Sequence, residues 1–188
     1  MPRIFTLLTL LIAVASGPVS AKKIAGIDMP DTMDIAGASL RLNGAGVRTK
    51  MFMDIYVGGL YLLKSNGNSA QIIAADEPMS IRLHMVSGLI TSEAMEEATL
   101  EGFKNATGGN TGPIQAHIDD FVKVFREPIS EGDVFDIAHE PGEGLQVYKN
   151  GTFKSAVDGG VEFKKAVFAI WIGDKPAQKG LKKGMLGK

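Results

Sequence analysis

The order of strand-like and helix-like segments is the feature that most constrains the fold of this chain. Alternating apolar residues predict strands between 38 and 62 and again from 79 to 86, and two consecutive helical patterns then fill 91–125. Three short strands follow, and an apolar helix is predicted over 161–172. This order does not fit the strict strand–helix alternation of a doubly wound parallel sheet. The sequence therefore predicts an α+β fold, in which helices pack on one face of an antiparallel sheet.

Glycines divide the first strand region. Gly44 and Gly46 predict a tight turn between two strands within 38–53. A long strand is predicted over 51–62, with a break or bulge at Gly58–Gly59 because glycine weakens a strand interior.

Other local signals mark the helices and the last hairpin. Thr91 or Ser92 can cap the first central helix, and Pro113 opens the second, which ends before Pro128. The dipeptide Asn150–Gly151 predicts a two-residue hairpin turn between the last two strands.

The amino-terminal segment predicts export. Arg3 precedes an apolar run over 4–15, and small residues follow up to Ala21, which together are typical of a cleaved secretory signal peptide. We therefore expect residues 1–21 to be removed, leaving one domain over 22–188 in the periplasm. The alternative is an uncleaved amino-terminal anchor. The apolar run is shorter than the about 20 residues of a membrane span, and no later segment approaches that length, so no membrane span is expected.

Composition excludes several classes of function. Twenty Lys and Arg against 21 Asp and Glu give a net charge of −1, so the chain lacks the positive field that collects nucleic acid. There is no cysteine, which excludes disulfides, thiolate zinc sites and cysteine nucleophiles. We expect a folded domain that does not bind nucleic acid.

Neither a metal nor a cofactor is expected. The three histidines, His84, His117 and His139, fall in three separate predicted elements without the short spacing of metal ligands. Gly44–Ala45–Gly46 begins like a dinucleotide fingerprint, but a strand follows it where that fingerprint requires a helix.

Two segments resemble motifs of the chalcone isomerase family. LNGAGVR at 42–48 is similar to the family's G-A-G-x-R motif, and DIYVGGLYL at 54–62 is similar to its following strand, which ends in G-x-Y-L. Residues 121–125 and the carboxyl-terminal segment from Ile172 resemble later parts of the family in the same order. The whole resembles the bacterial exported branch. The resemblance implies an open-faced β-sandwich, a large antiparallel sheet with helices packed on one face.

The resemblance also implies which positions face a ligand. Plant members of the family cyclise a chalcone to a flavanone, and Arg48 matches the arginine that holds the oxyanion. Tyr56 stands where the family has a threonine, while Met95 and Gly102 stand where it has a tyrosine and an asparagine, and Ile170 replaces a threonine or serine. Because most of the polar set is absent, we expect no catalytic residues and a non-catalytic protein.

The surviving pair resembles another branch of the family, the plastid fatty-acid-binding proteins. In that branch an arginine and a tyrosine hold a carboxylate at the mouth of an apolar tunnel. The resemblance implies that Arg48 and Tyr56 bind the head group of a small apolar carboxylate, such as a fatty acid, and that Met95 and Ile170 line the pocket. Two alternatives stay open: an isomerase or lyase acting on an unsaturated ketone, and an interaction protein without a ligand. The shape of the interior discriminates among them.

Overall fold

The computed structural model describes residues 21–35 and 37–188. The predicted signal peptide falls on residues 1–20 and Ala21, so nearly all of it lies outside the described residues and it stays a prediction. Within the described residues, no helix combines the length and apolar character needed to cross a membrane. The same part of the chain contains no cluster of three or more His, Cys, Asp or Glu side chains suited to a metal ion.

The chain folds into strands, helices and two short 3-10 turns. The strands are β1 (Ala21–Ile24), β2 (Ile27–Pro30), β3 (Thr32–Ile35), β4 (Ala38–Lys50), β5 (Met53–Leu62), β6 (Met79–Met85), β7 (Val134–Glu140), β8 (Gly144–Lys149) and β9 (Thr152–Val157). The helices are α1 (Ser69–Ala74), α2 (Ser92–Ala106), α3 (Gln115–Val122), α4 (Gly160–Ile172) and α5 (Lys179–Met185), with 3-10 turns η1 (Gly112–Ile114) and η2 (Lys123–Phe125) flanking α3.

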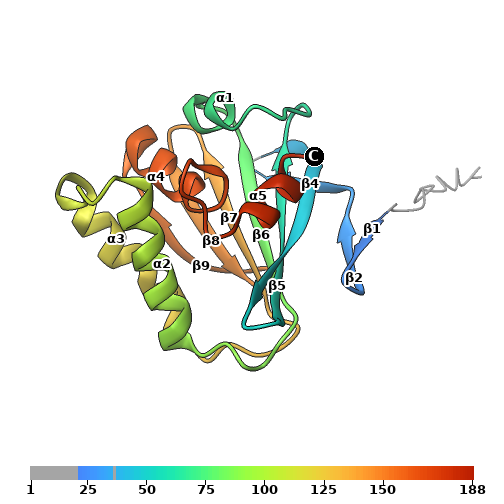
Figure 1. The fold of residues 1–188 in the computed structure, drawn as a ribbon. Helices are drawn as coiled ribbons and strands as arrows, with labels where there is room; N and C mark the ends of the chain where they lie inside the picture. Colours follow the sequence, from blue (N-terminus) through green and yellow to red (C-terminus); the bar gives the residue numbers. More distant parts are fainter. Residues whose placement is uncertain (1–20, 36) are drawn as a thin grey trace, which may run out of the picture.

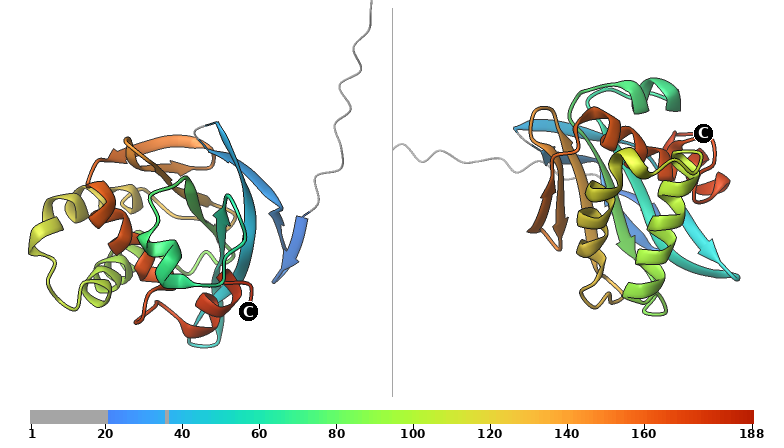
Figure 2. Two further views of the ribbon diagram at one scale, coloured as in Figure 1. Left: turned by 90° about the horizontal axis from the view of Figure 1, so that it is seen from above. Right: turned by 90° about the vertical axis from the view of Figure 1, so that its left-hand side faces the viewer.

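A curved antiparallel sheet of seven strands, β3 to β9 in chain order, forms the centre of the molecule. Figures 1 and 2 show α2, α3 and α4 on one side of this sheet and the β1–β2 hairpin on the other. The larger apolar core lies between the sheet and the helices, and a smaller one lies beneath the β1–β2 hairpin. The predicted α+β fold, an antiparallel sheet with helices on one face, is confirmed.

The predicted central helices and the last hairpin are present. Thr91 caps α2 by accepting a hydrogen bond from the backbone N–H of Ala94 at 3.2 Å. At the β8–β9 turn, Asn150 and Gly151 have φ angles of 52° and 75°, the left-handed conformation that a type I′ turn requires at both central residues.

The predicted turn at Gly44–Gly46 is wrong. β4 runs through both glycines as one strand, with a register shift between Leu42 and Gly44. The glycines instead allow the backbone of α5 to pack directly against the backbone of β4. A Cβ at Gly44 would overlap the backbone oxygen of Gly184, so no larger residue fits without moving α5.

The strand predicted over 51–62 also differs in detail. β5 begins only at Met53, because Met51 and Phe52 form the turn that joins it to β4. No break or bulge occurs at Gly58–Gly59, where β5 pairs without interruption with both neighbouring strands. The helix over 160–172 is followed by a further helix, α5.

Candidate ligand-binding site

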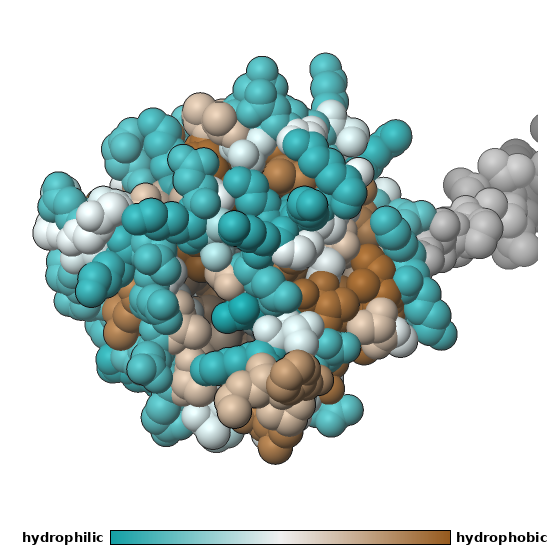
Figure 3. All heavy atoms as spheres, in the orientation of Figure 1, coloured by the Kyte–Doolittle hydropathy of each residue, from teal (hydrophilic) through white to brown (hydrophobic). Residues whose placement is uncertain are grey.

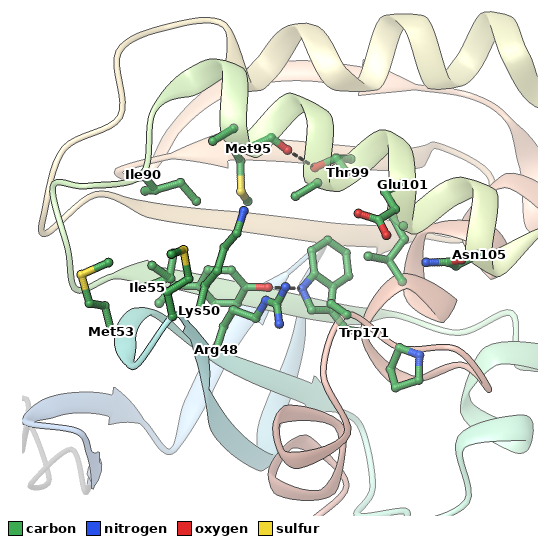
Figure 4. A pocket seen from close by; sticks show the side chains of 18 of the residues that line it. Arg48, Lys50, Met53, Ile55, Ile90, Met95, Thr99, Glu101, Asn105 and Trp171 are labelled. Atoms are coloured by element: carbon green, nitrogen blue, oxygen red, sulfur yellow. Dashed lines mark hydrogen bonds between the residues drawn. The ribbon is translucent and has the colours of Figure 1, made fainter.

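A cavity of about 410 Å³ lies between the β4–β5 hairpin, α2 and the carboxyl-terminal part of α4 (Figure 4). All four predicted site residues line it: Arg48, Tyr56, Met95 and Ile170. The exposed side chains of Lys50, Met51 and Leu89 also border it, so the cavity opens to solvent at the hairpin end. The structure therefore brings together residues from the β4–β5 hairpin, α2 and α4, which are far apart in the sequence.

Strand register places Arg48 beside Tyr56. The two residues are directly opposite each other in the β4–β5 ladder, and side chains of such a pair lie on the same face of a sheet. That face carries the larger apolar core and the helices, so both side chains are directed towards α2 and α4.

Tyr56 is 5% exposed, and its hydroxyl has one protein partner among the described residues. The indole N–H of Trp171 donates a hydrogen bond to the Tyr56 oxygen over 3.0 Å (Figure 4). An indole only donates, so this contact uses a lone pair of the tyrosine oxygen and leaves the tyrosine proton available.

Burial keeps that proton in place. Desolvation raises the pKa of Tyr56 above its ordinary value, and this effect outweighs the hydrogen bond from Trp171 and the positive charge of Arg48, which act in the opposite direction. At neutral pH Tyr56 is therefore a neutral hydroxyl that can donate one hydrogen bond into the cavity.

Arg48 is held by an uncharged partner. Its Nη1 donates to Oε1 of Gln178 at 3.3 Å, and the same oxygen accepts a hydrogen bond from the backbone N–H of Thr49 at 2.9 Å. Arg48 takes part in none of the ion pairs that join described side chains. Most of the five N–H donors of its guanidinium are consequently free to bind an anion.

The inner wall of the cavity is mostly aliphatic. Met95 and Ile170 are each 3% exposed and lie on α2 and α4. Gly102 lies further along α2. A Cβ at this position would come within 2.7 Å of Cγ2 of Ile170, so the absence of a side chain at Gly102 allows Ile170 to pack closely against α2. Gly102 and Ile170, two of the positions at which the resemblance implies polar catalytic side chains, thus form a close-packed apolar contact.

Several polar residues of the wall were not predicted as site residues. Lys50 lies at the mouth, and Thr99, Glu101 and Asn105 come from α2. The hydroxyl of Thr99 is already used, because it donates to the backbone oxygen of Met95 at 2.8 Å. Among the described residues that line the wall, Glu101 is the only acidic one, against the two cations Arg48 and Lys50.

Trp171 was also missed. It follows Ile170 directly and is the only tryptophan of the chain, and a buried indole N–H normally requires an acceptor. The need for an acceptor is the sequence signal that could have marked Trp171 as a site residue, although no neighbouring residue in the sequence identifies Tyr56 as that acceptor.

Comparisons with known proteins agree with this architecture. A model of the family described as chalcone isomerase-like matches residues 21–187. No curated protein matches the chain. Among solved structures, a fatty-acid binding protein from Arabidopsis thaliana is similar in fold, with a TM-score of 0.67 and 20% sequence identity over 86% of this chain and 92% of that one. The match over nearly the whole described chain shows that this protein belongs to the chalcone isomerase-like family.

Proposed function

We propose that this protein binds a small apolar carboxylate, such as a fatty acid, in the cavity beside Arg48. The observation that carries the proposal is a pair of hydrogen-bond donors, the Arg48 guanidinium and the Tyr56 hydroxyl, on one side of a largely aliphatic cavity. The carboxylate would lie between these two groups, and Met95 and Ile170 would contact the apolar tail.

The chemistry of the two donors favours an anion. A carboxylate only accepts hydrogen bonds, and a guanidinium presents a planar pair of N–H groups that matches its two oxygens. Lys50 adds a second positive charge at the mouth of the cavity, against the single acidic side chain of Glu101. A volume of about 410 Å³ falls within the roughly 300–1,000 Å³ of ordinary small-molecule sites.

The same site supports binding rather than catalysis. Isomerase chemistry on an unsaturated ketone needs donors placed where the enolate charge develops. Met95, Gly102 and Ile170 offer no such donors, and the hydroxyl of the nearby Thr99 is bonded to the helix backbone. An interaction protein without a ligand would need no cavity here.

The place of action is also part of the proposal. The signal-like segment over 1–21 supports export to the periplasm, where the protein would act as a carrier or sensor of its ligand. The mature amino terminus would then be Lys22. An intact Met1 on protein recovered from its native cell envelope would contradict this assignment.

Calorimetric titration with decanoate tests the binding function. We expect Arg48→Ala to weaken binding by about 2 to 5 kcal/mol, because the carboxylate would be buried without its countercharge. Arg41→Ala is the matched control, since Arg41 lies on the same strand but is exposed and outside the cavity. Equal affinity of the wild type and Arg48→Ala, or no binding by either, would contradict the proposal.

A further inference from the structure

The turn between β4 and β5 carries residues that its backbone disfavours. Met51 and Phe52 have φ angles of 50° and 68°, the left-handed region, which asparagine and glycine adopt far more readily than large apolar residues. The β8–β9 turn of the same chain has nearly identical angles and uses Asn150 and Gly151. Large apolar residues thus occupy a turn for which this chain elsewhere uses residues that adopt the left-handed conformation with little strain. Backbone strain of this kind is concentrated at functional sites.

The same side chains project into solvent. Phe52 is fully exposed and Met51 is 79% exposed. Leu89, in the loop between β6 and α2, is 66% exposed, and Met53 is 43% exposed. We call these four residues the apolar tip. Figure 3 shows apolar side chains gathered at the lower edge of the molecule, where Figure 1 places the β4–β5 turn and the β6–α2 loop.

The shape and size of the apolar tip fit a lipid surface better than a protein partner. It consists of four exposed side chains on the β4–β5 hairpin and the β6–α2 loop, whereas a standard protein interface uses about 20 to 30 residues from each partner. Lys50 adjoins the tip and forms no ion pair with a described side chain, so its charge is available to anionic lipid head groups. Apolar side chains beside an exposed cation are typical of surfaces that lie in the membrane interface.

The tip is continuous with the cavity. Met51, Met53 and Leu89 belong both to the tip and to the wall of the cavity mouth. We propose that the apolar tip inserts into the surface of a lipid bilayer and so places the cavity mouth against the membrane. This inference goes beyond the proposed function, because the tip can bind a bilayer whatever the cavity holds.

A turn exchange separates membrane binding from folding. The double variant Met51→Asn, Phe52→Gly gives the β4–β5 turn the residues of the β8–β9 turn, which favour the same backbone angles. We expect this variant to fold at least as stably as the wild type. In flotation with phosphatidylcholine vesicles containing phosphatidylglycerol, we expect its partition coefficient to fall at least about tenfold, since burial of a Phe side chain is lost.

Phe153→Ser is the matched control. Phe153 is also an exposed aromatic residue, at 53%, but it lies on the edge strand β9, which three strands separate from the β4–β5 hairpin. We expect it to float like the wild type. Every variant is made in the full chain, so the segment over 1–20 contributes equally to all of them.

A second readout reports on the tip itself. In a Phe52→Trp variant, brominated lipids should quench additional tryptophan emission, and in a Phe153→Trp variant they should not. The inference is overturned if the turn exchange leaves flotation unchanged, or if the tip causes self-association in sedimentation without binding vesicles. Arg48→Ala should bind vesicles like the wild type, so failure of fatty-acid binding is distinguishable from failure of membrane docking.

Discussion

At the scale of single residues, Trp171 determines how Tyr56 can interact with a ligand. The indole N–H occupies a lone pair of the tyrosine oxygen, so the hydroxyl proton needs an acceptor elsewhere. Arg48 lies opposite Tyr56 in the strand ladder and cannot accept that proton, because a guanidinium has only donors. The hydroxyl proton of Tyr56 and the remaining N–H groups of Arg48 therefore have no acceptor side chain among the described residues, and a bound carboxylate would accept from both.

Removing the Tyr56 hydroxyl tests this arrangement through stability and binding together. Tyr56→Phe leaves the buried indole N–H without its acceptor, so we expect the free energy of unfolding to fall by about 1 to 3 kcal/mol. Decanoate affinity should fall by about 0.5 to 1.5 kcal/mol, the range for one hydrogen bond. Urea unfolding and calorimetry measure the two effects.

The double variant Tyr56→Phe, Trp171→Phe is the control for stability. It removes both partners, so it should recover part of the stability lost in Tyr56→Phe, because no buried polar group is left unpaired. A Tyr56→Phe protein as stable as the wild type would show that the Trp171 hydrogen bond does not form.

At the scale of elements, α5 fixes the position of the strand that carries Arg48. The amide of Asn43 donates to the backbone oxygen of Met185 at 2.9 Å, and Gln178, immediately before α5, binds Arg48. Gly44 and Gly184 allow helix and strand backbones to touch. Local order at the mouth of the cavity therefore depends on a short helix at the far end of the chain.

Gly44→Ala should separate α5 from β4. We expect the free energy of unfolding to fall by about 1 to 3 kcal/mol or more, because the new methyl group meets rigid backbone atoms. Gly180→Ala, in the same helix, is the control: its Cβ would have no heavy atom nearer than 4.0 Å, and alanine favours the helix. Thermal unfolding measures both, and a Gly44→Ala protein with wild-type stability would contradict the close approach.

These elements also show what the sequence could and could not predict. The helices α2, α3 and α4 and the Asn150–Gly151 hairpin follow from local periodicity and turn chemistry, and the structure contains them. Gly44 was misinterpreted as a turn residue because the reason for it, Gly184, lies 140 positions further along the chain. The packing of α5 on β4 has little local signal, because two glycines and three lysines leave this helix only Leu181 and Met185 as buried residues.

Site residues divide in the same way. Arg48, Tyr56, Met95 and Ile170 were named through the family resemblance, and the structure places all four around one cavity. Periodicity alone could not have grouped them, because the contacts between β4, α2 and α4 are tertiary. Whether they bind a carboxylate stays a prediction.

At the scale of the whole molecule, a buried lysine joins α4 to α1. Lys164 of α4 is fully buried, and its ammonium group donates to the backbone oxygens of Ile72 and Ile73 at 3.0 Å each. These oxygens lie in the last turn of α1, where carbonyl groups lack helical partners. The contact anchors α1 to α4, and burial lowers the pKa of Lys164 to about 8.

This pKa predicts an unusual dependence of stability on pH. Between about pH 8 and 10 the unfolded chain holds the Lys164 proton more tightly than the folded chain does, so the free energy of unfolding should rise with pH. Above about pH 10 it should fall again, because burial raises the pKa of Tyr61 to about 12 and the unfolded tyrosine loses its proton earlier. Urea midpoints measured across this range test the prediction.

Lys164→Met supplies the comparison for that experiment. The variant should be less stable at neutral pH, since the carbonyl groups of α1 lose their donor, and its urea midpoint should show no rise between pH 8 and 10. A wild-type midpoint that stays flat or falls over this interval would mean that the folded chain does not depress the Lys164 pKa.

The most direct test of the proposed head-group site is ¹³C NMR of decanoate labelled at its carboxyl carbon. In the complex with the wild type, we expect the label to remain a carboxylate at pH values below the pKa of the free acid, because Arg48 stabilises the ionised form. Binding to Arg48→Ala, at concentrations that overcome its weaker affinity, should remove that shift and raise the pKa of the bound acid. Identical titration of the label in the two proteins would contradict a carboxylate held by Arg48 and Tyr56.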